Sequence, residues 1–86
     1  MSYRVFWSPQ AERRLEEIAF ASADRQQIAN AAKKIDYRLV ADPTAFGESR
    51  YDTVRVGFER PLAIQYDVLV DVRTVIVLDV WRIKRR

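Results

Sequence analysis

The fold is decided by the segment Thr74-Val75-Ile76-Val77-Leu78-Asp79-Val80-Trp81-Arg82. This run is almost continuously apolar and rich in β-branched residues, which is typical of a strand in the middle of a sheet. Because side chains alternate between the two faces of a strand, the run divides into two sets. We expect one face to carry Ile76, Leu78 and Val80, and the other to carry Val75, Val77, Asp79 and Trp81.

Two segments upstream of this run alternate with a period of two, which predicts two further strands. Gly57 and Pro61 mark the bend or the edge between them. Residues 70–73 are expected to form the turn before the last strand, and residues 44–49 to form a surface loop. The alternating apolar positions are Val54, Val56 and Phe58 in one strand, against Thr53, Arg55 and Gly57, and Leu62, Ile64, Tyr66 and Val68 in the other.

The amino-terminal part of the chain carries the signals of one strand and two helices. Tyr3-Arg4-Val5-Phe6-Trp7 alternates as a strand, and Ser8-Pro9 supplies a helix cap followed by a proline at the first helical position. A second helix is expected to begin after Ser22 or Asp24 and to end at Asp42-Pro43, because proline drives the preceding residue out of the helical region. The apolar stripes of the two helices are Ala11, Leu15, Ile18 and Ala19, and Ile28, Ala31, Ala32, Ile35 and Leu39.

These elements predict an α+β fold of two layers with the order β-α-α-β-β-β. In this fold an antiparallel sheet packs against a helical hairpin. The chain has 86 residues, of which 49% are hydrophobic and 31% are charged, as in ordinary globular domains. No linker or repeat divides it, so we expect residues 1–86 to form a single domain.

The composition excludes several kinds of chemistry. The chain has neither cysteine nor histidine, which excludes disulfides, thiolate nucleophiles, imidazole bases and sulfur-ligated zinc. No carboxylate cluster has the spacing of a metal site and no glycine-rich loop is present, so we expect no metal and no small-molecule cofactor. Without an apolar stretch of membrane-spanning length or a signal-peptide core, the protein is expected to be cytoplasmic and not to bind membranes.

The basic residues suggest a binding site for phosphate groups. The net charge is +3, and residues 82–86 hold four of the 15 cations. Guanidinium groups bind phosphate oxygens with two parallel hydrogen bonds, so an arginine-rich groove without histidine can still position RNA for cleavage. The cations that can converge there are Arg50, Arg55 and Arg60, which are five residues apart, with Arg82, Lys84, Arg85 and Arg86. The plainer alternative for the last four is a solvated tail.

The sheet face opposite the helices is the expected location of this site. Its expected occupants are Arg4, Arg55, Gln65, Asp67, Asp79 and Trp81, whose plainer role is to form ion pairs on a wet surface. Trp81 and Phe58 can stack on bases, or simply pack. Candidates for a general base are Tyr66, Glu48, Glu59 and Asp79, and their spacing favours none of them.

The ordered set of these motifs resembles the RelE/ParE toxin family, in the branch of plasmid-stabilisation toxins. The resemblance begins with Tyr3–Ala11 and Leu15 and extends over essentially the whole chain. Each motif is short, so the order of the set carries the resemblance. The later motifs are Asp42-Pro43, Gly47–Arg50, Pro61–Tyr66, Arg73–Val75 and Val77–Arg82.

The resemblance implies the toxin of a bacterial type II toxin–antitoxin system, whose partner is a cognate antitoxin. RelE-like members cut mRNA on the ribosome without a metal, whereas ParE-like members inhibit DNA gyrase. For the first activity the resemblance points to Arg82, to Arg60, and to Arg50 or Arg55. Combined with the residue-based candidates above, this gives Arg55, Arg60, Arg82 and Tyr66 as the expected catalytic residues, and Arg50, Trp81, Lys84, Arg85 and Arg86 as the expected RNA-binding residues. The chain lacks the histidine and the late tyrosine of several nucleases, so gyrase inhibition and an inactive binding module remain the alternatives.

Overall fold

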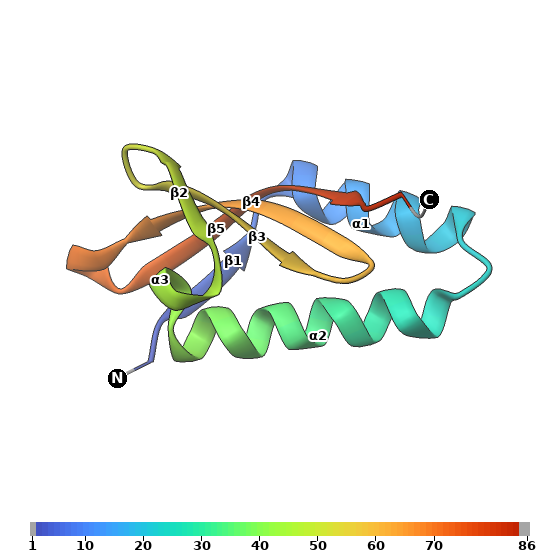
Figure 1. The fold of residues 1–86 in the computed structure, drawn as a ribbon, viewed down its shortest axis with the longest axis horizontal. Coiled ribbons are helices and arrows are strands. Elements are labelled where there is room, and N and C mark those ends of the chain that lie inside the picture. Colours follow the sequence, from blue (N-terminus) through green and yellow to red (C-terminus); the bar gives the residue numbers. More distant parts are fainter. Residues whose placement is uncertain (1, 85–86) are drawn as a thin grey trace.

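The computed structural model describes residues 2–84, in which one strand and two long helices precede four further strands (Figure 1). The predicted α+β class and the order of the predicted elements are confirmed, with one strand and one short helix more than predicted. The elements are β1 (Arg4–Trp7), α1 (Pro9–Ala21), α2 (Arg25–Ala41), α3 (Pro43–Phe46), β2 (Glu48–Tyr51), β3 (Val54–Glu59), β4 (Leu62–Leu69), a 3-10 turn (Val70–Val72) and β5 (Thr74–Arg82).

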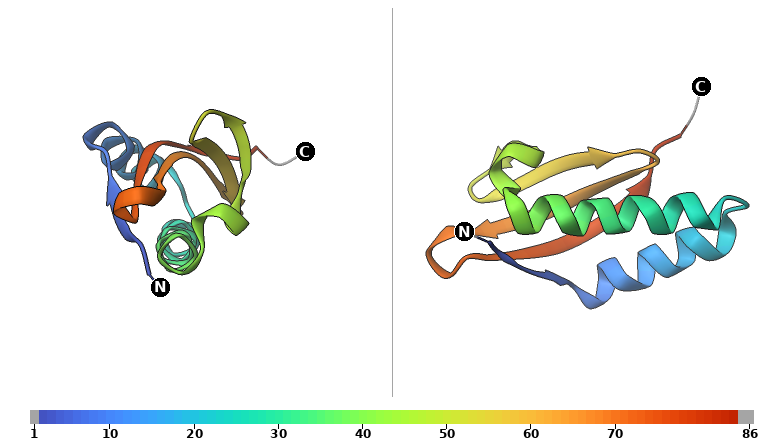
Figure 2. Two further views of the ribbon diagram at one scale, coloured as in Figure 1. Left: turned by 90° about the vertical axis from the view of Figure 1, so that its left-hand side faces the viewer. Right: turned by 90° about the horizontal axis from the view of Figure 1, so that it is seen from below.

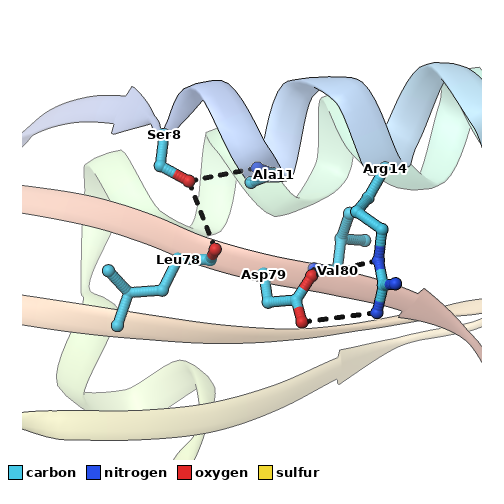
Figure 3. A network of polar contacts seen from close by, with 6 residues as sticks. All are labelled: Ser8, Ala11, Arg14, Leu78, Asp79 and Val80. Carbon is cyan, nitrogen blue, oxygen red and sulfur yellow. Dashed lines mark hydrogen bonds and ion pairs between the residues drawn. The ribbon is translucent and has the colours of Figure 1, made fainter.

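Ser8 connects the start of α1 to the last strand. Its hydroxyl accepts a 3.1 Å hydrogen bond from the amide of Ala11, which confirms the predicted cap, and it donates to the carbonyl of Leu78 at 3.2 Å (Figure 3). Further along α1, the guanidinium of Arg14 pairs with the carboxylate of Asp79 at 3.3 Å. These contacts fix α1 beside β5 at the point where β1 has ended.

The five strands form one sheet in the order β1-β5-β4-β3-β2. The apolar strand β5 is therefore an interior strand, as predicted. β1 pairs with it in parallel, with Val5 opposite Val75, so the prediction of a wholly antiparallel sheet is wrong at this pair. The direction of β1 is set by the helices that follow it, because only a tight turn forces two strands to be antiparallel.

A β-bulge at Leu78 changes the alternation of β5. Val77 lies opposite Tyr66 and Asp79 lies opposite Gln65, so Leu78 is the extra residue. Val80 is consequently buried on the same side as Val75 and Val77, and the predicted division of the faces is wrong here. Asp79 and Trp81 lie on the sheet face opposite Val80, where Arg14 reaches Asp79 from the edge, whereas Arg82 lies on the same side as Val80.

A short helix and a strand, α3 and β2, occupy most of residues 44–49, where a surface loop was predicted. The carboxylate of Asp42 accepts a hydrogen bond from the amide of Ala45 and caps α3. Phe46 at the end of α3 is only 9% exposed, and its ring centroid lies 5.9 Å from that of Tyr66. The adjoining strand β2 is exposed at all four positions, so it has no apolar pattern by which it could be recognised.

The helices α1 and α2 cover one face of the sheet (Figure 2). Between them and the sheet lies the main core, which includes Ile28, Ala31, Ile35, Leu39, Ile64, Tyr66, Val75, Val77 and Val80. Within residues 2–84, no helix is both long enough and apolar enough to cross a membrane.

Candidate functional site: a cationic groove and an aromatic sheet face

A groove of about 460 Å³ lies between α2, the β3–β4 turn and the end of β5. Three of its lining residues are cations, Lys34, Arg60 and Arg82, and one is an anion, Asp24. The groove therefore favours an anionic ligand. Its other lining residues are Gln27, Asn30, Ala31, Pro61 and Ile83, which provide amide groups and an apolar floor.

Arg82 is held at the wall of this groove by the connection between α1 and α2. Its Nη1 and Nη2 atoms each lie 3.1 Å from an oxygen of the Asp24 carboxylate, and Nη1 also donates to the hydroxyl of Ser22 at 3.1 Å. The hydrogen bond from Arg82 holds the pKa of Asp24 below its ordinary value. The carboxylate is thus ionised at neutral pH, and is a poor proton acceptor.

Arg60 enters the same groove from the β3–β4 turn and is exposed. Leu62 lies opposite Arg82 in the sheet, so the turn that carries Arg60 and the end of β5 lie at the same end of the sheet. Arg60 and Arg82 are therefore the two predicted catalytic cations that the fold brings together.

Arg55 lies elsewhere, on the helix side of the sheet, so its predicted position on the open face is wrong. Its register partner is the buried Tyr66, whereas the neighbouring Val56 pairs with Gln65 on the open side. Nη2 of Arg55 donates to the backbone carbonyls of Thr44 and Gly47, both at 2.8 Å. Arg55 therefore links α3 and the following residue, Gly47, to the sheet.

Tyr66 is fully buried beside Arg55. Its hydroxyl donates a 2.6 Å hydrogen bond to the carbonyl of Pro43, and burial raises the pKa of this hydroxyl above its ordinary value. A phenol that is buried, hydrogen-bonded and hard to ionise serves packing better than proton transfer. Tyr66 is therefore a poor candidate for the general base of the predicted reaction.

The predicted RNA-binding residues do not gather around the groove. Arg50 lies at an irregularity of the β2–β3 pairing, away from the β3–β4 turn, so Arg50, Arg55 and Arg60 do not converge as expected. Trp81 lies on the open face, and Lys84 is exposed beyond β5. Arg85 and Arg86 lie outside the described residues.

The open face of the sheet carries exposed aromatic side chains. Phe58 is 54% exposed and shares a row with Ala63 and Trp81. Phe6 and Tyr51 lie at the two ends of another row on this face, and the row of Gln65 and Asp79 lies between the two. The expected positions of Gln65, Asp67, Asp79 and Trp81 on this face are confirmed by the register. This combination of exposed aromatic rings on a pleated surface suits a protein partner.

Sequence reasoning missed the contribution of α2 to the groove. Gln27, Asn30 and Lys34 recur at helical spacing, beside the buried stripe that includes Ala31. That polar stripe was a usable signal. Asp24 occupies a predicted capping position before α2, yet its side chain makes no capping hydrogen bond and instead binds Arg82. Among residues 2–84, no three potential ligand side chains cluster as a metal site would require.

The fold is shared with solved structures of toxin–antitoxin complexes. A chain of the toxin–antitoxin complex RelBE2 from Mycobacterium tuberculosis superposes with a TM-score of 0.77 and 19% sequence identity, covering 95% of this chain and 99% of that chain. A chain of the chromosomal ParDE system from P. aeruginosa superposes with a TM-score of 0.69 and 16% identity, covering 96% of this chain and 98% of that chain. The chain therefore has the RelE/ParE toxin fold. No family model matches its sequence, and no curated protein matches it either.

Proposed function

We propose that this chain is the toxin of a bacterial type II toxin–antitoxin pair, and that it acts by cutting mRNA on the ribosome. Two independent features support the proposal: the fold shared with chains of two toxin–antitoxin complexes over nearly the full length, and the cationic groove with Arg60 and Arg82. The groove is the observation that favours RNA, because arginine side chains match the geometry of phosphate oxygens.

In the proposed reaction, the 2′-hydroxyl oxygen of one nucleotide attacks the adjacent phosphorus. The bond from phosphorus to the 5′-oxygen breaks, leaving a cyclic phosphate and a free 5′-hydroxyl after a proton has moved from the one oxygen to the other. Negative charge increases on the phosphate in the transition state, and Arg60, Arg82 and Lys34 stabilise that charge. Since the lining residues offer no free base, most of the catalysis must come from orientation of the RNA, which the ribosome supports.

The open sheet face is the proposed docking surface for the antitoxin. An amphipathic segment of the antitoxin would cover the aromatic side chains of Phe6, Phe58 and Trp81, which are at least partly exposed. An acidic segment is favoured, because the chain carries a net charge of +3.

Inhibition of DNA gyrase is the second candidate activity. The shared fold with the ParDE chain supports it, and so does the absence of histidine from the whole sequence. An inactive binding module of the same fold would show neither activity.

The test is primer extension on mRNA in a reconstituted bacterial translation reaction, with and without ribosomes. Cuts that require ribosomes and disappear in Arg82→Gln and Arg60→Gln, but persist in the control Arg13→Gln on the exposed side of α1, would support the nuclease. Uncut mRNA together with inhibition of gyrase supercoiling would transfer the proposal to the gyrase activity. If neither assay responds, the toxin proposal is wrong.

A further inference from the structure

Arg82 uses only part of its hydrogen-bonding capacity in the contact with Asp24. A guanidinium has five N–H donors. Three of those in Arg82 are engaged, two with the Asp24 carboxylate and one with the hydroxyl of Ser22. No acceptor for its Nε–H or for the second N–H of Nη2 occurs among residues 2–84.

The two remaining donors form a second recognition edge. In the planar guanidinium, Nη1 and Nη2 together make the end that Asp24 occupies. Nε–H and the outer N–H of Nη2 are parallel to each other along one side, and this pair matches two oxygens of a carboxylate or a phosphate. Arg82 lines the groove together with its other two cations, Lys34 and Arg60.

The anchor of Arg82 is itself fixed. The Ser22 hydroxyl donates a 2.6 Å hydrogen bond to the carbonyl of Ile18 in the last turn of α1, so its oxygen is left to accept from Arg82. Asp24 lies directly before the first residue of α2. One arginine is thus held by two residues of the connection between the helices, and its side chain need not be ordered by the ligand.

We propose that Asp24 and Ser22 are positioning residues, which orient Arg82 so that its free edge receives the phosphodiester of the ligand. The ligand class rests on the proposed function, but the orienting role does not require that RNA be cut. The alternative role of Asp24 is to compete with the ligand for Arg82, in which case its negative charge lowers the affinity of the groove for anions.

The two effects differ in sign. If Asp24 only competes, Asp24→Asn removes a negative charge and tightens phosphate binding. If Asp24 orients Arg82, the variant weakens binding, because the flexible side chain must then be ordered by the ligand. Asp24 and Arg82 are both half-buried, and three hydrogen bonds fix the guanidinium, so we expect the orienting effect to dominate.

The experiment follows the side-chain Nε–H signal of Arg82 by NMR while a 2′-deoxy dinucleotide monophosphate is added. This probe carries one phosphodiester and has no attacking hydroxyl. In the wild type the signal should shift and saturate, and in Asp24→Asn the affinity should fall about tenfold. Asp36→Asn is the matched control, because it removes the same charge from another part of α2, where Asp36 accepts from the indole of Trp7, and it should bind as the wild type does.

Two further variants keep the test decisive. Arg82→Lys retains the charge without the paired donors and should lose about as much affinity as Asp24→Asn. Ser22→Ala removes one of the three anchoring hydrogen bonds and should give a smaller loss of the same sign, which can be measured even if Asp24→Asn is poorly folded.

The positioning role would be overturned if folded Asp24→Asn and Ser22→Ala bind the probe as tightly as the wild type does, or more tightly. It would also be overturned if the Nε–H signal of wild-type Arg82 does not shift when the probe is added. A chain that cuts no RNA but binds the probe in this Asp24-dependent way would contradict the nuclease activity and retain the positioning role. The converse result, ribosome-dependent cutting with binding indifferent to Asp24, would retain the nuclease and reject the positioning role.

Discussion

The hydroxyl of Tyr66 donates a 2.6 Å hydrogen bond to the carbonyl oxygen of Pro43, which joins the middle of the sheet to the first residue of α3. The donor is completely buried and Pro43 is buried as well, so water cannot replace the bond. Together with the ring of Phe46, this contact holds α3 against β3 and β4.

Tyr66→Phe should therefore destabilise the protein by about 1–2 kcal/mol, because the carbonyl of Pro43 remains buried without its donor. Urea unfolding followed by circular dichroism would measure this change. Probe binding in the groove and toxicity should be retained by the folded variant. Full stability combined with lost RNA cleavage would instead make Tyr66 catalytic.

Gly47 should not tolerate a larger side chain, because the backbone of Val56 and the hydroxyl of Tyr66 occupy the space that a Cβ atom would need. A Cβ atom at this position would lie 2.8 Å from the Tyr66 hydroxyl and would also collide with the backbone carbonyl of Val56. Since that carbonyl belongs to a paired strand, Gly47→Ala should cost about 1–3 kcal/mol in unfolding free energy. Ser49→Ala, in the exposed neighbouring strand, is the control and should change the stability by less than about 0.5 kcal/mol. Equal stability of the two variants would contradict the close packing around Gly47.

The ion pair between Asp24 and Arg82 should make the protein sensitive to acid. The folded pKa of Asp24 is lowered, mainly by the hydrogen bond from Arg82, so the unfolded chain takes up the proton at a higher pH than the folded protein does. This contribution to stability is present above about pH 4 and is lost as the pH falls through the folded pKa.

In Asp24→Asn the free energy of unfolding should therefore fall less steeply below about pH 4 than in the wild type, and Arg82→Gln should have the same effect. The double variant should add little to either single variant, because both remove one interaction. Thermal unfolding at a series of pH values between 2 and 6 would record the effect. Two results would show that the pair contributes nothing to the folded state: losses of stability that add up in the double variant, or single variants whose stability falls with acid as steeply as that of the wild type.

The local patterns of this sequence predicted its elements well where one face is buried. The stripe through Ile28, Ile35 and Leu39 marked α2, and the apolar run of β5 indicated an interior strand, because burial imposes a period on the sequence. Strand β2 lies at the edge of the sheet with every side chain exposed, so burial imposed no period there. The parallel pairing of β1 with β5 could not be predicted from local patterns, because the two strands are far apart in the sequence and their direction depends on the connections between them.

The candidate site was less predictable because single residues change sides. The bulge at Leu78 reverses the alternation in β5, so Val75 and Val77 lie on the helix side together with Val80 and with Arg82, which meets Asp24 there. The equal spacing of Arg50, Arg55 and Arg60 along the chain likewise suggested that the three side chains converge. In the structure Arg50 lies on the edge strand β2, Arg55 contacts α3, and Arg60 lies in the β3–β4 turn. The groove depends on contacts between α2 and the sheet that are distant in sequence.

The exposed aromatic row of the sheet should be required for binding the antitoxin. Phe58 is 54% exposed and lies in one row with the fully buried Ala63 and with Trp81 on the open face. Aromatic side chains at the centre of an interface commonly carry a large part of the binding free energy. Phe58→Ser should therefore weaken the complex with the proposed cognate antitoxin at least about tenfold, as measured by calorimetry. Phe20→Ser is the control, because Phe20 is 80% exposed at the end of α1, outside the sheet, and its loss should leave the affinity unchanged. If the Phe20 variant loses binding and the Phe58 variant does not, the antitoxin binds the helical hairpin rather than the open face.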